Sequence, residues 1–170
     1  MWTTATWVDA YVVTARGVLL PPVRQDLGSP HGATVEAGAG GAILVTADNS
    51  FVYVFAPFVG SAVPVRVLDL QFRRFVNVTR DYPALVAQDA QMWWHAYGPA
   101  GVGGGGSFGV LAAWVGDECM LAKGHSAWAT VGRLEAQGRL SGKPAPGYPA
   151  GAEYVKVLRT FLKKHGYCGS

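Results

Sequence analysis

Cys119 carries the chemistry that stands out first, because a thiol near a histidine is a common pair for nucleophilic catalysis. His125 follows it six residues later, and His95 precedes it. The cysteine falls, however, in the apolar run of residues 119–122, which predicts a strand. A small cysteine in such a strand usually packs as a hydrophobic residue. An enzyme is therefore the least favoured class of function, and we expect no catalytic residue.

Neither a metal site nor a cofactor site is indicated. No two of the histidines have a metal-ligand spacing; they are His31, His95, His125 and His165. The glycine run Gly101–Gly106 contains no Gly-Lys-Ser/Thr, and a strand rather than a helix is predicted after it. A phosphate-binding helix N-terminus is therefore missing. Asp117 and Glu118 are adjacent and point in different directions, so they do not form a catalytic carboxylate pair.

The aromatic residues favour binding over catalysis. The chain has six tryptophans, and the adjacent pair Trp93-Trp94 cannot turn both rings toward one core from a helix. Some aromatic surface is therefore exposed, and exposed aromatic residues mark recognition sites. Aromatic grooves bind proline-rich segments, because a preformed polyproline helix packs on flat rings at low entropic cost. Nucleic acid is a less favoured ligand, since no nucleic-acid-binding motif is present.

Length and composition predict one globular domain spanning residues 1–170. The chain is 50% hydrophobic and 15% charged, with Gly/Pro-rich insertions near residues 17–41 and 124–151. No apolar run is long enough to cross a membrane, and the start of the chain does not resemble a secretory signal. We therefore expect a cytoplasmic protein. Cys119 and Cys168 are expected as free thiols, with a single bridge as the alternative.

Charge is unevenly distributed along the chain. Residues 1–120 hold six Lys/Arg against nine acids, whereas residues 121–170 hold eight against two. This asymmetry predicts a basic face suited to an acidic protein surface or to acidic phospholipid headgroups. A solvated helix face beside a basic loop is the alternative interpretation.

The sequence predicts that both helices and strands position these residues. Helices are expected near residues 7–12, 84–95, 127–137 and 152–165, and strands near 42–46, 51–55, 63–70, 72–78, 107–115 and 119–122. For the first segment, a strand beginning near Tyr11 is the competing interpretation. Asp81 is a candidate helix cap, and a hairpin turn is expected at Gly116-Asp117. This order indicates an α+β domain with mostly antiparallel pairing.

The closing helix has the strongest periodicity. Its apolar residues recur at helical spacing on one face; they are Tyr154, Val155, Leu158, Phe161 and Leu162. The basic residues lie largely on the opposite face; they are Lys156, Arg159, Lys163 and Lys164. Gly166 follows the last periodic residue and is expected to end the helix.

Three segments together resemble profilin, the small actin- and polyproline-binding family. Trp7–Val12 is similar to the family's opening Trp-x-x-Tyr-Val helix, with one extra residue between the aromatics. Gly41–Tyr53 resembles its first hairpin, and Val155–Tyr167 resembles its closing helix. The Gly103–Gly106 run resembles the glycine-rich entry to its last hairpin. The family's Lys-Lys-Gly-Ala-x-Gly motif is absent.

The resemblance implies a fold and a set of binding residues. The fold is a central antiparallel sheet with the N- and C-terminal helices packed on one face. The implied polyproline groove consists of Trp7, Tyr11, Tyr53, Phe161 and Tyr167. Lys156 and Arg159 are the implied contacts for actin or an actin-like partner. The chain's own proline-rich segment, residues 142–149, is expected near this groove.

The leading expectation is a non-enzymatic, cytoplasmic protein that binds proline-rich ligands. The alternative is an α+β interaction subunit or immunity-type protein, with its aromatics mostly in the core and with no polyproline or actin binding.

Overall fold

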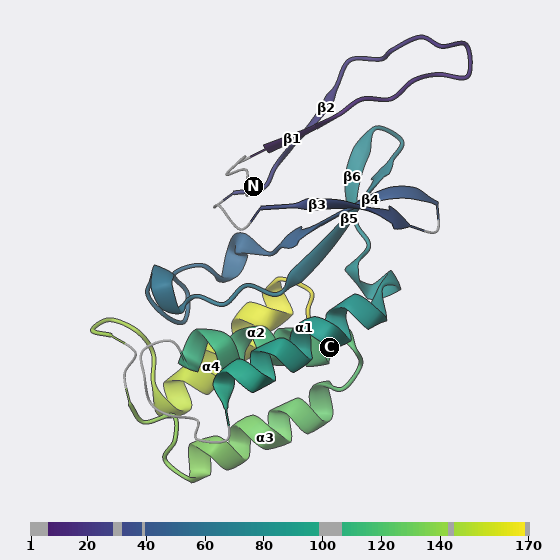
Figure 1. Cartoon of the computed structure of the whole chain (residues 1–170). Coiled ribbons are helices and arrows are strands. Elements are labelled where there is room, and N and C mark those ends of the chain that lie inside the picture. Colours follow the sequence, from purple (N-terminus) through teal and green to yellow (C-terminus); the bar gives the residue numbers. More distant parts are fainter. Residues whose placement is uncertain (1–6, 29–31, 39, 99–106, 143–144, 169–170) are drawn as a thin grey trace. The chain divides into compact units, whose positions relative to one another are not determined.

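The structure is a computed structural model that describes all residues except 1–6, 29–31, 39, 99–106, 143–144 and 169–170. Its elements confirm the α+β class, with antiparallel sheets and α-helices (Figure 1). Where one domain was predicted, contacts within the chain form two compact units. The first, called the β unit, is Met1–Asn49 with Val65–Asp81. The second, called the helical unit, is Ser50–Pro64 with Tyr82–Ser170.

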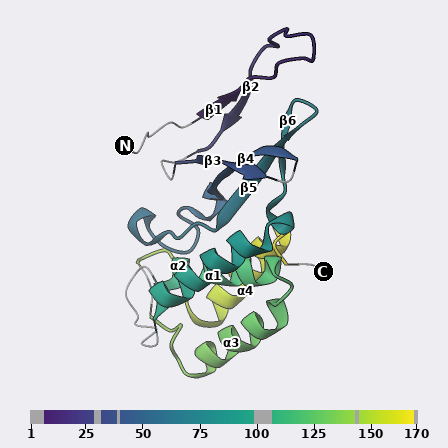
Figure 2. The ribbon, with the colours of Figure 1, turned by 45° about the vertical axis from the view of Figure 1, so that its right-hand side comes forward.

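The described strands belong to the β unit and pair only in antiparallel fashion. They are β1 (Trp7–Ala10), β2 (Val23–Asp26), β3 (Thr34–Gly38), β4 (Gly41–Ala47), β5 (Val65–Gln71) and β6 (Arg74–Asn77). β1 pairs with β2, and the other four form a sheet in the order β3-β4-β5-β6 (Figure 2). The predictions of strands at β4, β5 and β6 are confirmed. The predicted long connection of residues 17–41 instead contains β2 and β3.

The helix predicted at Trp7–Val12 is wrong, because Trp7–Ala10 is the strand β1. The competing interpretation of a strand placed its start four residues too late. Pairing with β2 sets Asp9 opposite Arg24, and the guanidinium donates to both carboxylate oxygens over 2.8 Å. Arg24 also lies 5.4 Å from the centre of the Trp7 ring. Cross-strand contacts and β-branched neighbours thus outweigh the helical spacing of Trp7 and Tyr11.

The β unit has a small core of its own. Leu27, Leu44 and Leu68 are buried together, and Val8 and Phe75 pack against them. The side chains come from β1, the residue after β2 and three strands of the sheet. Burial of alternate strand residues on one face therefore holds this unit together.

Residues 51–55 do not form the predicted partner strand of β4. Asn49–Phe51 and Phe58–Gly60 are short 3₁₀ turns, and β4 pairs with β3 and β5 instead. Phe51 and Phe55 are each 1% exposed and pack on α4 of the helical unit. Burial of these two rings, four residues apart, replaces the ladder hydrogen bonds that a hairpin would have made.

The helical unit contains α1 (Pro83–Tyr97), α2 (Ser107–Met120), α3 (Gly124–Ala136) and α4 (Gly151–Lys164). The predictions of α1, α3 and α4 are confirmed. The residue before α1 is Tyr82, without a side-chain cap, so the predicted Asp81 cap is wrong; Asp81 lies in the preceding 3₁₀ turn. Gly98 ends α1.

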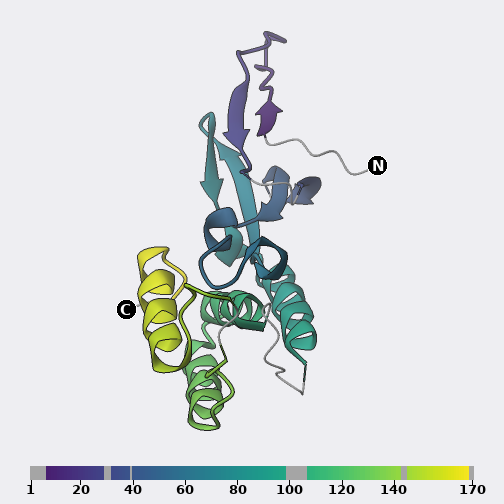
Figure 3. The same ribbon diagram turned by 90° about the vertical axis from the view of Figure 1, so that its left-hand side faces the viewer.

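The hairpin predicted at residues 107–122 is also wrong, since this segment is the helix α2. Ten of its fourteen residues are buried, among them Gly116 and Asp117 at the predicted turn. Figure 3 shows α2 between α1 and α4. A helix enclosed on several sides has no polar face, so its sequence lacks the amphipathic period that identifies helices.

Two contacts fix the neighbours of α2. The Tyr154 hydroxyl of α4 donates to the Phe108 carbonyl oxygen over 2.8 Å, in the buried interior. On another side, a Cβ atom placed on Gly109 would lie 2.2 Å from the Gly60 carbonyl oxygen. The backbone of residues 50–64 therefore approaches α2 as closely as a glycine permits.

The end of α4 turns back on its own helix. Gly166 has the left-handed φ of +73°, and the Tyr167 N–H donates to the Leu162 carbonyl oxygen over 2.9 Å. This is the glycine stop that the sequence predicted. It directs Tyr167 inward and brings Cys168 toward α2.

Candidate functional site

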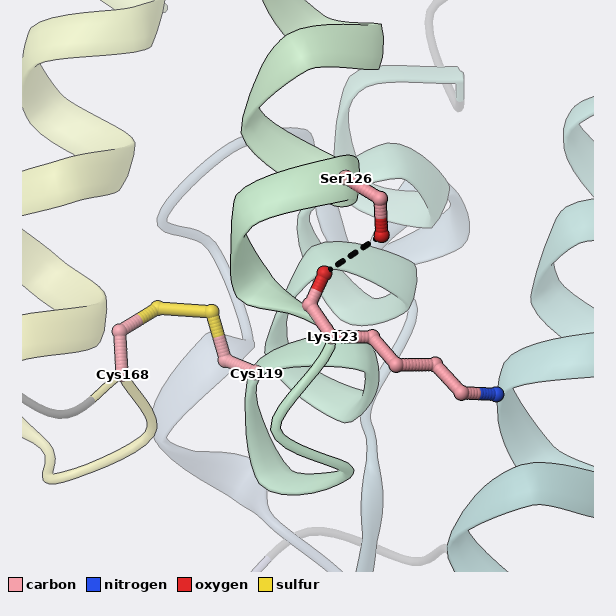
Figure 4. The surroundings of a disulfide bond; sticks show 4 residues. All are labelled: Cys119, Lys123, Ser126 and Cys168. Carbon is pink, nitrogen blue, oxygen red and sulfur yellow. Dashed lines mark hydrogen bonds between the residues drawn. A yellow bond between two sulfur atoms is a disulfide. The ribbon is translucent and has the colours of Figure 1, made fainter.

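The last turn of α2 is tied to the chain's C-terminal segment by a disulfide. Cys119 and Cys168 are bonded, with their Cα atoms 4.9 Å apart (Figure 4). The expectation of two free thiols is therefore wrong, and the alternative of a single bridge is correct. The return of the chain at Gly166 brings the two residues together, although they are separated by 49 positions.

Beyond this bond, the chain enters α3 at Lys123. The Ser126 hydroxyl donates to the Lys123 carbonyl oxygen over 2.8 Å, and the Lys123 side chain points away from the disulfide (Figure 4). Lys123 and Glu118 both line a hollow beside α1. The disulfide thus anchors the end of α2, which bears one wall of this hollow.

Trp94 forms an aromatic ridge on the surface of the helical unit. Its ring is stacked on Tyr97 at 5.8 Å and lies 4.5 Å from the ring of Trp114 on α2. Trp94 is 41% exposed, whereas Trp114 and Tyr97 are almost buried. The two buried rings therefore hold Trp94 in place while part of its own ring remains open to a ligand.

An open hollow of about 320 Å³ lies on one side of Trp94. Small alanine side chains from α1 line it, and Trp94 and Trp114 form an aromatic wall. Its polar groups are Gln91, Glu118 and Lys123. The surface combines a flat apolar wall with one acid, one base and one amide, which suits orientation of a ligand rather than covalent chemistry.

A second hollow, of about 220 Å³, is also lined by Trp94. Trp94 and Tyr97 line it together with Thr130, Arg133 and Arg139. Burial raises the pKa of Tyr97, and the charge of Arg139 partly offsets that rise. The hydroxyl is therefore neutral at ordinary pH, and the positive charge of this hollow comes from the two arginines. We call the two hollows and the Trp94 ridge the Trp94 cleft.

A buried acid lies at the packing surface of α1 and α2. Asp117 is 1% exposed, and among the described residues neither of its oxygens receives a hydrogen bond. Burial, Asp89 and Glu118 raise the pKa of Asp117 to about 10. Asp89, on α1, acts on this buried carboxyl as a second acid, and the Trp93 Nε1–H donates to an Asp89 carboxylate oxygen over 3.0 Å. The sequence prediction that residues 117–118 form no carboxylate pair overlooked this acid on the opposite helix.

The residues predicted for a polyproline groove fall into different places. Trp7 and Tyr11 belong to the β unit and are 52% and 59% exposed. The structure brings Phe161 and Tyr167 together around Phe51, at ring distances of 4.8 and 5.1 Å. Phe161 is half-buried and Tyr167 is 3% exposed. Both therefore serve the core of the helical unit.

Tyr53 is 62% exposed and lies against Phe58, 5.8 Å away between ring centres. The two basic residues predicted to contact a partner, Lys156 and Arg159, are both exposed on α4. Arg159 covers the Trp128 ring of α3 at 4.4 Å. This contact with Trp128 accounts for the position of the Arg159 side chain, so no partner is needed to explain it.

Sequence reasoning identified an exposed ring at Trp93-Trp94 but not the rest of the cleft. The signal for Trp94 was the presence of two adjacent tryptophans on a helix. Trp114 and Glu118 were missed because residues 107–122 were predicted as a hairpin. The arginines of the second hollow were assigned only to the basic C-terminal third.

Within the described residues, no three His, Cys, Asp or Glu side chains gather in a way that would hold a metal ion. None of the described helices has the length and apolarity to cross a membrane. The glycine run Gly101–Gly106, Pro144 and His31 lie outside the described residues.

Comparison with known proteins finds no matching family model and no matching solved structure. A probable thylakoid lumen protein of Synechocystis sp. (strain ATCC 27184 / PCC 6803 / Kazusa) is similar to this chain. It is 26% identical over 121 residues, which cover 61% of this chain and 31% of that protein. The chain thus spans about a third of the length of this relative.

This relative overturns the predicted location. A thylakoid lumen is not cytoplasm, so the expectation of a cytoplasmic protein is corrected. The comparisons give no support to a cytoskeletal or actin-binding role, which stays a prediction from the sequence alone.

Proposed function

We propose that this chain is a non-catalytic binding protein whose helical unit holds an extended, proline-rich peptide segment across the Trp94 cleft. The observation that carries the proposal is the exposed Trp94 ring, which lines two hollows and is held by Trp114 and Tyr97. Proline-rich segments dock on surfaces lined by aromatic rings, because a preformed polyproline helix loses little entropy when it packs on them. The function predicted from the sequence is thus kept, but it is assigned to different residues.

The two hollows of the Trp94 cleft differ in their charged residues. The first hollow contains Glu118 with Lys123, whereas the second contains Arg133 and Arg139. A peptide with an acidic residue at one end of its proline run complements the two arginines of the second hollow, whereas the charges of the first hollow balance. Loss of the acidic residue from such a peptide is expected to weaken binding more at low salt than at high salt.

The test is retention on a poly-proline resin, followed by titration of a proline-rich peptide monitored by tryptophan fluorescence. Trp94→Ala is expected to abolish retention, since it removes the ridge that both hollows share. Trp7→Ala is the matched control, because Trp7 is also an exposed tryptophan but belongs to the β unit. Loss of binding in Trp7→Ala alone would restore the groove predicted from the sequence. No retention of the unmodified protein would reject both.

We further propose that the protein works in an oxidising compartment outside the cytoplasm. The support is the Cys119–Cys168 bond together with the lumenal name of the Synechocystis relative. Alkylation of the protein from its native source is expected to modify no cysteine before reduction and both after it. Two accessible thiols in unreduced protein would contradict this proposal.

A further inference from the structure

A second surface of the helical unit has no part in the cleft. Residues Ser50–Pro64 contain no charged side chain. Within this segment Tyr53 is 62% exposed, Phe58 is 41% exposed and Val59 is 100% exposed. We call residues 50–64 the apolar loop. Three exposed apolar side chains in an uncharged segment are unusual for a surface in contact with water alone.

Buried side chains and hydrogen bonds hold the apolar loop in one conformation. Phe51 and Phe55 are buried, with Phe161 of α4 4.8 and 5.2 Å away between ring centres. The Tyr53 N–H donates to the Ser61 hydroxyl over 3.0 Å, and that hydroxyl lies 3.1 Å from the Ala56 carbonyl oxygen.

The same bond maintains an uncommon backbone conformation. Tyr53 has a φ of +62°, in the left-handed region that costs free energy for a residue with a side chain. The loop therefore presents its exposed rings without having to order them on binding, which lowers the entropic cost of docking.

The distribution of charge between the two units indicates which kind of surface the apolar loop contacts. The helical unit contains eight Lys/Arg against five Asp/Glu, whereas the β unit contains six of each. The whole net charge of +3 therefore belongs to the unit that bears the apolar loop. α4, which packs on the base of the loop through Phe161, ends in the exposed Lys163 and Lys164.

We propose that the apolar loop docks the helical unit on an anionic lipid surface, where Tyr53, Phe58 and Val59 enter the interface and the lysines of α4 attract the headgroups. Aromatic side chains with a polar end favour the boundary between lipid and water. Basic residues near an anionic leaflet add attraction that reaches over about one Debye length. An acidic protein would complement the charge, but an uncharged loop with a fully exposed valine matches acyl chains better.

The experiment is sedimentation with vesicles of three parts phosphatidylcholine to one part phosphatidylglycerol, compared with vesicles of pure phosphatidylcholine. The unmodified protein is expected to sediment with the first and not with the second. Val59→Asp is expected to lower the partition coefficient about tenfold or more, because it places a charge at the tip of the loop. The double variant Lys163→Glu/Lys164→Glu is expected to have a lower partition coefficient. The decrease is expected to be at least about fivefold for each charge removed.

Two controls separate this proposal from general surface effects. Phe72→Asp changes a 97% exposed residue of the β unit and is expected to leave partition unchanged. Arg16→Glu, also in the β unit, controls for a reversed charge on an exposed residue. If Val59→Asp still binds the vesicles, binding depends on charge alone and not on insertion of the apolar loop, which would overturn the proposal. Failure to bind either vesicle overturns it as well, and points to a protein partner. Unchanged circular dichroism confirms that each variant is folded.

Discussion

Asp117 shows how burial alone changes the chemistry of one residue. Its carboxyl is enclosed by α1 and α2, with Asp89 opposite and Glu118 next to it. A buried carboxyl beside two other acids keeps its proton, because its charged form would lose hydration and be repelled by its neighbours. The proton retained by Asp117 therefore allows the two helices to pack, since a neutral carboxyl does not repel Asp89.

The first prediction concerns the pH dependence of stability. The pKa of Asp117 is about 10 in the folded protein, against an ordinary value of 3.8 in the unfolded chain. Between these limits the folded state retains a proton that the unfolded state has released. The free energy of unfolding therefore falls as pH rises, by at most about 1.4 kcal/mol per pH unit from this group.

Asp117→Asn is expected to flatten this slope and to be more stable than the unmodified protein at pH 9. Its amide does not titrate. Urea midpoints measured at pH 5, 7 and 9 provide the comparison. Glu135→Gln, at an exposed position on α3, is the control and is expected to leave the slope unchanged. A slope identical in Asp117→Asn and the unmodified protein would show that Asp117 is ionised in the folded state.

The second prediction concerns the buried hydroxyl of Tyr154. It donates to the Phe108 carbonyl oxygen over 2.8 Å, and Tyr154 is fully buried. Tyr154→Phe leaves that carbonyl without the donor, so we expect a loss of about 1–3 kcal/mol of unfolding free energy. Urea unfolding measures the loss. Tyr148→Phe is the control, since it also removes a tyrosine hydroxyl. No loss in Tyr154→Phe would mean that water replaces the missing donor.

At the scale of elements, the contact between α2 and the apolar loop depends on glycine. The loop backbone at Gly60 lies so near Gly109 that an added Cβ would be 2.2 Å from the carbonyl oxygen. Backbone atoms cannot move aside as a flexible side chain can. Gly109 therefore determines how deeply the loop settles on α2, and with it the placement of the exposed rings.

The third prediction compares two glycines in helices. Gly109→Ala is expected to lower the free energy of unfolding by about 1–3 kcal/mol, because the methyl group forces the loop away from α2. Gly132→Ala in α3 meets nothing within 4 Å and is expected to raise it by about 0.5–1 kcal/mol through helix propensity. Thermal unfolding of both variants measures the difference. A gain in stability for both would mean that the loop backbone can shift without cost.

Sequence periodicity identified elements only where one face of the element meets water. α4 has buried residues on one face and exposed lysines on the other, so its sequence predicted it nearly residue for residue. α2 was predicted as a hairpin because its apolar residues are distributed around the whole helix. At β1, the spacing of Trp7 and Tyr11 indicated a helix, but pairing with β2 determined the outcome. A short sequence pattern gives no information about which distant strand will pair with that segment.

At the scale of the whole molecule, the disulfide is the covalent link that restrains the helical unit. It closes a loop between positions 49 residues apart and joins the end of α2 to the segment after α4. Such a link stabilises a fold mainly by restricting the unfolded chain. It also secures the end of α2 that bears Glu118 of the Trp94 cleft.

The fourth prediction is that removal of this bond weakens the helical unit. Cys119→Ala with Cys168→Ala is expected to lower the free energy of unfolding by about 2–4 kcal/mol. Thermal unfolding with and without reductant is the measurement. The unmodified protein is expected to lose stability on reduction, whereas the double variant is expected to be insensitive to it. Equal stability of all four samples would contradict a structural role for the bond.

The sequence by itself determined the α+β class, the strands β4 to β6, the helices α1, α3 and α4, and the concentration of positive charge after residue 120. These depend on the period of apolar residues and on composition, both of which are local properties. The tertiary structure alone decided the nature of α2, the Cys119–Cys168 bond, the approach of Asp89 to Asp117 and the assembly of the Trp94 cleft. Each of these joins residues from separate elements, and only the packed chain excludes water from between them.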